Sequence, residues 1–197
     1  SGCLTYSSWN FSQARSIAAN TSGDKSDIII ATNATEIKKL AVKGYMGEVI
    51  ECETTLSARE KKSTEIQKST GATFIHPSND LDVILGQGTA CKELLGRHSD
   101  LDYIFTPVGG GGLIAGSALA AKYFGSNCTV IGSEPFEVDD AYRSLISGKI
   151  EKNNSKNTIA DGLKTDLGNI NFPIIIKEIN DIIRVEEKEI TKTMKVS

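Results

Sequence analysis

Four consecutive glycines, at residues 109–112, form the segment of this sequence that points most directly to chemistry. An apolar run typical of a strand ends at Thr106, and an apolar run typical of a helix begins at Leu113. Glycine lets the backbone adopt positive φ and approach a ligand closely. The first turn of a helix also presents unpaired amides and the positive end of its dipole. The segment therefore predicts a site for an anionic group, for which a phosphate is the usual occupant.

Two other phosphate-binding motifs fit these glycines less well. A P-loop ends in Gly-Lys followed by Ser or Thr, whereas Gly112 is followed by Leu113. A dinucleotide-binding fingerprint spaces its glycines as GxGxxG and places an acidic residue about 20 positions further on. Glu134 lies near that distance, but four uninterrupted glycines match the spacing poorly. A turn without a ligand could use one or two glycines, so a phosphate cradle is the better interpretation.

A polar segment near the start, SSWNFSQA at residues 7–14, is the second candidate. Taken alone, Ser8 or Asn10 could simply cap a helix expected over residues 11–19. The glycine segment elsewhere in the chain favours a ligand contact instead.

An acidic segment, GSEPFEVDD at residues 132–140, follows an expected strand. Glu134 and Asp140 offer hard oxygen donors, which suit Mg²⁺ or Ca²⁺ with several waters retained. The alternative is a solvated acidic loop whose charge favours the start of a helix.

Alternating strand and helix patterns must position these residues. Near-continuous apolar strands separated by helices predict an α/β protein with open parallel sheets covered on both faces. In the helix expected over residues 34–43, Ile37, Leu40 and Ala41 recur at helical spacing. A boundary near His76-Pro77 predicts a small α/β domain at residues 1–78 and a large one at 79–197. The remaining strands are expected at residues 27–31, 47–51, 73–75, 102–106 and 129–132, and the remaining helices at 56–69, 83–95 and 113–124.

Composition narrows the class of protein further. The chain has 197 residues, a formal net charge of −3 and 24% charged residues, and it has no basic patch that would favour nucleic acid. The pairs Lys38-Lys39 and Lys61-Lys62 are expected on solvated helix faces. No apolar run is long enough to span a bilayer. Four cysteines that are far apart in the sequence predict reduced, mostly buried thiols in a cytoplasmic protein.

These motifs together resemble one family. PVGGGGLIAG, at residues 107–116, resembles the phosphate loop of fold-type II pyridoxal-phosphate (PLP) enzymes, the tryptophan synthase β-like family. The segment at 7–14 resembles that family's SSGNHxQA motif, although Trp9 replaces a glycine and Phe11 a histidine. TIADG at 158–162 and the metal loop at 132–140 are most similar to the serine racemase and threonine dehydratase branch.

The resemblance assigns a role to each motif. Asn10 would hydrogen-bond the 3′-oxygen of PLP, Ser8 would be the catalytic acid and base opposite a lysine, and Gln13 would contact an activating nucleotide such as ATP. Glu134, the Val138 carbonyl and Asp140 would bind Mg²⁺ or Ca²⁺. The residues that would surround the cofactor's phosphate and ring are Gly109, Gly110, Gly111, Gly112, Leu113 and Gly162.

The implied activity is racemisation of serine, or elimination of ammonia from L-serine or L-threonine, by imine chemistry at the Cα of the amino acid. In the family, the imine-forming lysine precedes the SSGNH-like motif by a few tens of residues. Six residues precede Ser7 and none is lysine. We therefore expect a core fragment, cut at both ends, of an enzyme that is a homodimer when whole. The alternative is an inactive relative that keeps the fold and a phosphate or metal site.

Overall fold

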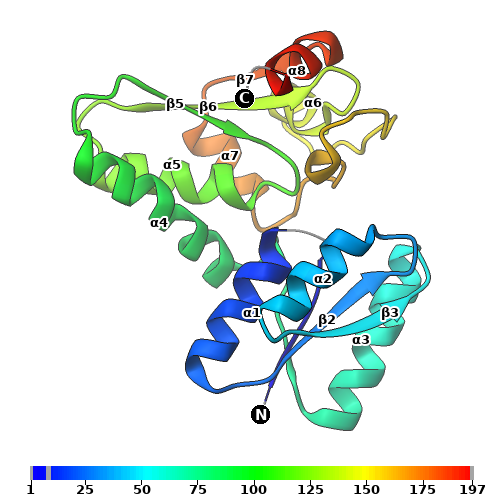
Figure 1. Ribbon diagram of the computed structural model, residues 1–197. Coiled ribbons are helices and arrows are strands. Elements are labelled where there is room, and N and C mark those ends of the chain that lie inside the picture. Colours follow the sequence, from blue (N-terminus) through cyan, green and yellow to red (C-terminus); the bar gives the residue numbers. More distant parts are fainter. Residues whose placement is uncertain (1, 8–9, 196–197) are drawn as a thin grey trace. The chain divides into compact units, whose positions relative to one another are not determined.

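The computed structural model describes residues 2–7 and 10–195. The chain divides into two compact units, Ser1–Pro77 and Ser78–Ser197, and each has a parallel sheet of its own (Figure 1). The predicted α/β class with open parallel sheets is therefore confirmed.

The first unit has a four-stranded sheet in the order β3-β2-β1-β4, in which every neighbouring pair is parallel. Helices connect successive strands, as parallel pairing requires. The strands are β1 (Cys3–Tyr6), β2 (Ser26–Ala31), β3 (Glu48–Cys52) and β4 (Thr73–Phe74), and the helices are α1 (Asn10–Ser22), α2 (Glu36–Gly44) and α3 (Leu56–Thr70).

The central strand β2 is buried on both faces. Ile29 packs with Leu4 and with Ile66 of α3, whereas Ile28 and its neighbours on the other face pack with Val42 of α2. Successive side chains of a strand point to opposite faces, so a strand between two helical layers must be apolar throughout. The apolar run at residues 27–31 therefore forms the centre of this unit.

Helix α2 buries a different side from the one that its apolar residues predict. Ile37 and Leu40 are 68% and 62% exposed, whereas Lys39 is buried at 6%. The Lys39 ammonium donates to the Thr32 carbonyl at 3.2 Å and to the Glu51 carboxylate at 3.0 Å. These two acceptors, together with Glu36, compensate the buried charge. The expectation of a solvated Lys39 was therefore wrong.

The second unit has a three-stranded parallel sheet in the order β5-β6-β7. Helix α4 (Leu81–Arg97) precedes it and α8 (Glu187–Met194) follows it. The elements between are β5 (Tyr103–Pro107), α5 (Gly112–Phe124), β6 (Thr129–Pro135), α6 (Asp140–Ser147), a 3-10 turn η1 (Asp161–Leu163), α7 (Phe172–Glu178) and β7 (Ile182–Val185).

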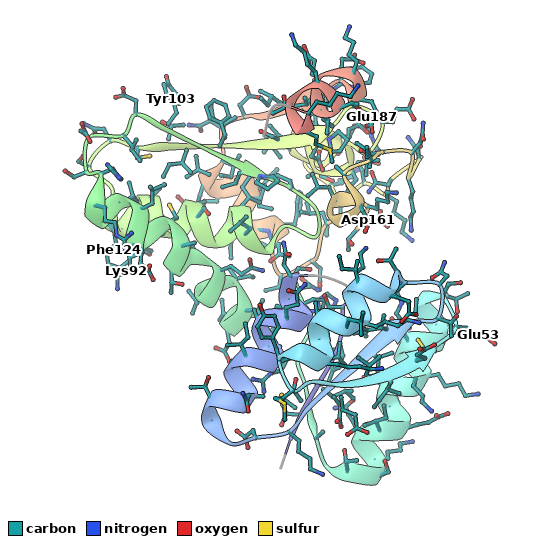
Figure 2. All side chains as sticks on the ribbon, in the orientation of Figure 1. Glu53, Lys92, Tyr103, Phe124, Asp161 and Glu187 are labelled. Atoms are coloured by element: carbon teal, nitrogen blue, oxygen red, sulfur yellow. The ribbon has the colours of Figure 1, made fainter. Side chains whose placement is uncertain are left out.

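Helices α4, α5 and α7 line one face of this sheet, and their apolar side chains form its core (Figure 1). Helices α4 and α5 pack so closely that a Cβ on Gly116 of α5 would lie 2.2 Å from the carbonyl oxygen of Ile84 of α4. This close contact fixes α5, and therefore also the glycine segment that precedes it. On β5, Ile104 is buried in the core, whereas Tyr103 and Phe105 are each 59% exposed. Tyr103 is labelled in Figure 2.

Among the described residues, no helix is both long and apolar enough to cross a membrane. The four cysteines are free thiols, as predicted, and Cys3 and Cys91 are the buried ones.

Candidate functional site

The glycine segment forms the junction between β5 and α5. Gly111 precedes the first residue of α5 and has φ +89°, a left-handed conformation that L-residues with a Cβ rarely adopt. A Cβ on Gly111 would also lie 2.6 Å from Cδ1 of Leu167. Both the backbone angle and the packing therefore require glycine at this position.

The junction presents a row of free amides. Within the described chain, the backbone amides from Gly109 to Leu113 donate no hydrogen bond to another residue. They stand at the N-terminus of a 13-residue helix, where the dipole is positive. A buried or half-buried amide without a partner is unusual in a protein, unless a ligand or water accepts its hydrogen. The junction is therefore chemically suited to an oxyanion with several oxygens, such as a phosphate.

Gly162 of the TIADG segment lies beside this junction. A Cβ on Gly109 would be 3.0 Å from the carbonyl oxygen of Gly162 and 3.3 Å from Cα of Leu163. Gly162 belongs to the 3-10 turn η1, whose first residue, Asp161, is labelled in Figure 2. The fold thus brings together two motifs that are about fifty residues apart in the sequence.

The carboxylate of Glu134 lies at the end of β6 and is 1% exposed. It accepts hydrogen bonds from the first turn of α6, from the amides of Tyr142 at 2.8 Å and Ala141 at 3.3 Å. Burial raises the pKa of Glu134 to about 8, and the nearby Asp140 carboxylate raises this pKa further, whereas the two amides lower it.

The carboxylate of Asp140, at the start of α6, is fully buried. It accepts hydrogen bonds at 2.7 Å from the Leu167 amide and at 2.7 Å from Nδ2 of Asn153. Burial raises the pKa of Asp140 to about 6, although these donors oppose the shift. Because burial is the main cause of both shifts, ionising the two carboxylates together is unfavourable unless a cation binds beside them.

The third predicted metal ligand, beside Glu134 and Asp140, is the backbone carbonyl of Val138. Val138 is fully buried, and its carbonyl oxygen accepts no hydrogen bond from the described part of the chain. No cluster of three His, Cys, Asp or Glu side chains suited to a metal occurs among residues 2–7 and 10–195. The predicted set instead has two carboxylates and one backbone carbonyl, and this combination fits a hard cation that keeps several waters.

An arginine to which no motif assigned a role contacts the carboxylate segment from outside. The Arg184 guanidinium lies 4.4 Å from the ring centroid of Phe136 and 4.3 Å from that of Tyr142. It also pairs with Asp139 at 3.1 Å, and Arg143 pairs with the same carboxylate at 2.8 Å. These contacts fix the residues between β6 and α6, and the sequence does not reveal them because Arg184 and Asp139 lie 45 positions apart.

The polar segment at residues 7–14 belongs to the first unit. Ser8, the predicted acid and base, and Trp9 lie outside the described residues. Helix α1 begins at Asn10, which is exposed, and Gln13 lies one turn further along the same helix, partly exposed. Asn10 and Gln13 therefore share a helix, while the glycine junction and the carboxylates belong to the second unit.

Two parallel α/β units, one of which has a junction suited to an anion before a helix, are typical of ligand-binding α/β proteins. A family model places the chain more narrowly. The chain belongs to the family of pyridoxal-phosphate dependent enzymes, whose model matches residues 1–196. The resemblance inferred from the motifs is thus confirmed.

Relatives within the family point to one branch. A serine racemase of Dictyostelium discoideum is 42% identical over 197 residues, which cover 99% of this chain and 61% of the relative. The structure of maize serine racemase superposes with a TM-score of 0.95 at 39% identity, covering 99% of this chain and 59% of that one. The crystal structure of a T.th. threonine deaminase superposes with a TM-score of 0.91 at 36% identity, covering 99% of this chain and 65% of the deaminase. The chain therefore spans about three fifths of the length of these proteins.

Proposed function

We propose that the protein is a PLP-dependent enzyme that racemises serine or eliminates ammonia from serine or threonine. Family membership supports the cofactor class, and the serine racemase and threonine deaminase relatives support the substrate class. The observation that carries the proposal is the row of free amides from Gly109 to Leu113 at the start of α5.

In this proposal the amides of Gly109, Gly110, Gly111, Gly112 and Leu113 bind the phosphate of the cofactor. A phosphate dianion has enough acceptor oxygens for these donors, and the helix dipole stabilises its charge. Gly162 lies beside the cofactor ring, as the family resemblance implies, and its closeness to Gly109 supports this role. The second unit thereby fixes the phosphate end of the cofactor.

Bound PLP supplies an electron sink that stabilises negative charge at the Cα of an amino acid. The residues of this chain would orient the reactants and move protons. Asn10 would donate a hydrogen bond to the 3′-oxygen of the ring. After the family's lysine has taken the α-proton from one face of Cα, the Ser8 hydroxyl would give a proton to the other face. Proton return gives racemisation, whereas departure of the β-hydroxyl gives elimination.

Glu134, the Val138 carbonyl and Asp140 bind a divalent cation, Mg²⁺ or Ca²⁺. Two observations support this part of the proposal: the two carboxylates are buried close together, and the Val138 carbonyl accepts no hydrogen bond from a described residue. A divalent ion would balance this charge and supply the missing partner. Gln13, half-exposed on α1, contacts a nucleotide activator, and the intact enzyme is a homodimer.

A comparison of two ligands tests the cofactor assignment. The protein is titrated with pyridoxal 5′-phosphate and with pyridoxal, which lacks the phosphate, and binding is followed by absorbance and by calorimetry. We expect tight binding of the phosphorylated ligand and binding at least about 100-fold weaker for pyridoxal, because several charge-assisted hydrogen bonds are lost. Equal affinity for both ligands would refute the phosphate site.

Product analysis tests the reaction class. The full-length protein, including the segment expected to carry the imine-forming lysine, is incubated with PLP and L-serine, and D-serine and pyruvate are measured separately. Either product supports the proposal, and their ratio assigns racemase or ammonia-lyase. Cofactor binding with no D-serine or pyruvate from serine and no 2-oxobutanoate from threonine would instead support a relative that keeps the phosphate site and has lost catalysis.

A further inference from the structure

The carbonyl of Gly110, in the middle of the glycine junction, is held by two donors from one distant segment. The Gly168 amide donates to it at 3.2 Å, and Nδ2 of Asn171 donates to it as well. Both donors come from the residues just before and at the start of α7. Such double acceptance uses both lone pairs of a carbonyl and fixes its direction.

Because the peptide bond is planar, fixing the direction of the Gly110 carbonyl also fixes the direction of the Gly111 amide. The Gly110 carbonyl and the Gly111 amide belong to one trans peptide, so C=O and N–H point in opposite directions. Holding the carbonyl toward Gly168 and Asn171 therefore directs the Gly111 N–H away from them. That N–H belongs to the row of free amides proposed to bind the phosphate. A glycine-rich backbone has no side chains to fix its peptide planes, so the orientation must come from outside.

The surroundings of Asn171 argue against a role in stability alone. Asn171 is fully buried, and its Oδ1 is a buried atom that accepts no hydrogen bond from the described chain. An unsatisfied buried acceptor is unfavourable, and an apolar residue of similar size would avoid that cost. The contact that justifies an asparagine at this position is the one from Nδ2 to Gly110.

We propose that Asn171 is a positioning residue, which aims the Gly111 amide at the phosphate by holding the Gly110 carbonyl. The inference rests on the proposed function, since it assigns a new residue to the same anion site. Asn171 itself touches neither the phosphate nor the reacting atoms in this scheme. Its effect should therefore appear only with ligands that carry the phosphate.

The test uses two variants and a matched control. Asn171→Leu removes the donor and keeps the volume, and Asn171→Asp keeps the shape but has no donor when ionised. Asn169→Leu makes the same change two residues away, at an exposed position. For each protein, the dissociation constants of pyridoxal 5′-phosphate and pyridoxal are measured, together with the midpoint of urea unfolding.

We expect Asn171→Leu to bind pyridoxal 5′-phosphate about 3- to 10-fold more weakly than wild type, the effect of one neutral hydrogen bond. Its affinity for pyridoxal and its urea midpoint should stay at or above the wild-type values. Asn171→Asp should lose more affinity for the phosphorylated ligand, because a carboxylate near the site repels it. Asn169→Leu should match wild type for both ligands.

Two results would overturn the inference. One is wild-type affinity for pyridoxal 5′-phosphate in both Asn171 variants. The other is an equal loss of affinity for both ligands together with a lower urea midpoint, which would mean a purely structural role. A wild-type protein that does not prefer the phosphorylated ligand marks a different failure, that of the proposed function itself, and the inference falls with it.

Discussion

The amide of Leu167 lies 2.7 Å from Oδ2 of Asp140 and donates a hydrogen bond to it. The next amide along the chain, that of Gly168, donates to the carbonyl of Gly110 at 3.2 Å. Two successive residues thus connect the carboxylate segment to the glycine junction. If the Asp140 carboxylate moves when a cation binds, the peptide between Leu167 and Gly168 should move with it and shift the Gly110 carbonyl in the proposed phosphate site.

This connection predicts that cation and phosphate binding are coupled. We expect Mg²⁺ to tighten the binding of pyridoxal 5′-phosphate, and that ligand to tighten Mg²⁺ binding by the same factor, about 5-fold or more. Calorimetric titrations of each ligand with and without the other measure both factors. Gly168→Ala should reduce the coupling, because its Cβ would lie 2.3 Å from Oδ1 of Asn79 and displace the segment. Independent binding of the two ligands in wild type would contradict the prediction.

Replacement of Gly111 by alanine should damage both the fold and the phosphate site. The residue has φ +89°, and the new Cβ would lie 2.6 Å from Leu167. We expect a loss of about 2–4 kcal/mol in the free energy of unfolding, measured in urea, and a large loss of affinity for pyridoxal 5′-phosphate. Gly71→Ala is the matched control, since Gly71 has φ +69° but nothing lies within 4 Å of its added Cβ. That variant should lose only about 1 kcal/mol.

Divalent cations should stabilise the protein against heat. Binding to the folded state alone adds about 1.4 kcal/mol at a cation concentration ten times the dissociation constant. We therefore expect Mg²⁺ or Ca²⁺ to raise the melting temperature and EDTA to reverse the effect. The Asp140→Asn variant should lose the response, while Glu137→Gln, three positions earlier, should keep it. An equal rise in all three proteins would indicate a general salt effect and no site at Asp140.

Arg184 should contribute to stability through its two ring contacts and its pair with Asp139. Arg184→Ala is expected to lower the free energy of unfolding by about 1–2 kcal/mol, and Arg184→Lys by less, because a lysine keeps the charge but cannot stack in the same way. Urea unfolding curves measure both. Arg97→Ala, at an exposed position at the end of α4, serves as the control and should differ from wild type by no more than about 0.5 kcal/mol. A similar loss in the Arg97 variant would remove the special role of Arg184.

The sequence predicts the elements well where a helix or strand has a strong local pattern. The helix expected over residues 113–124 is observed as Gly112–Phe124, and the strand expected over 27–31 as Ser26–Ala31. Continuous apolar runs and a glycine at a junction are local patterns. They predict these elements correctly because the conformation there depends mainly on residues close in the sequence. The class of fold follows from their alternation.

Other features depend on partners that are distant in the sequence. No local pattern in the sequence singles out Asn171, because its partner Gly110 lies 61 positions away. The buried side of α2 was also misjudged, since Glu51 and Thr32 make a lysine acceptable inside while Ile37 and Leu40 stay exposed. The spacing of apolar residues along α2 shows which of its faces is apolar. It does not show that the Glu51 carboxylate, on strand β3, lies beside Lys39.

The enclosed ammonium of Lys39 has a further consequence for work with an aldehyde ligand. Aldehydes condense only with the neutral form of an amine, and the Glu51 contact is the main cause of the raised pKa of Lys39. Solvent also reaches this side chain poorly. At high aldehyde concentration, non-specific imines should therefore form on exposed lysines such as Lys61. Peptide mapping after reduction of these imines should find Lys39 unlabelled.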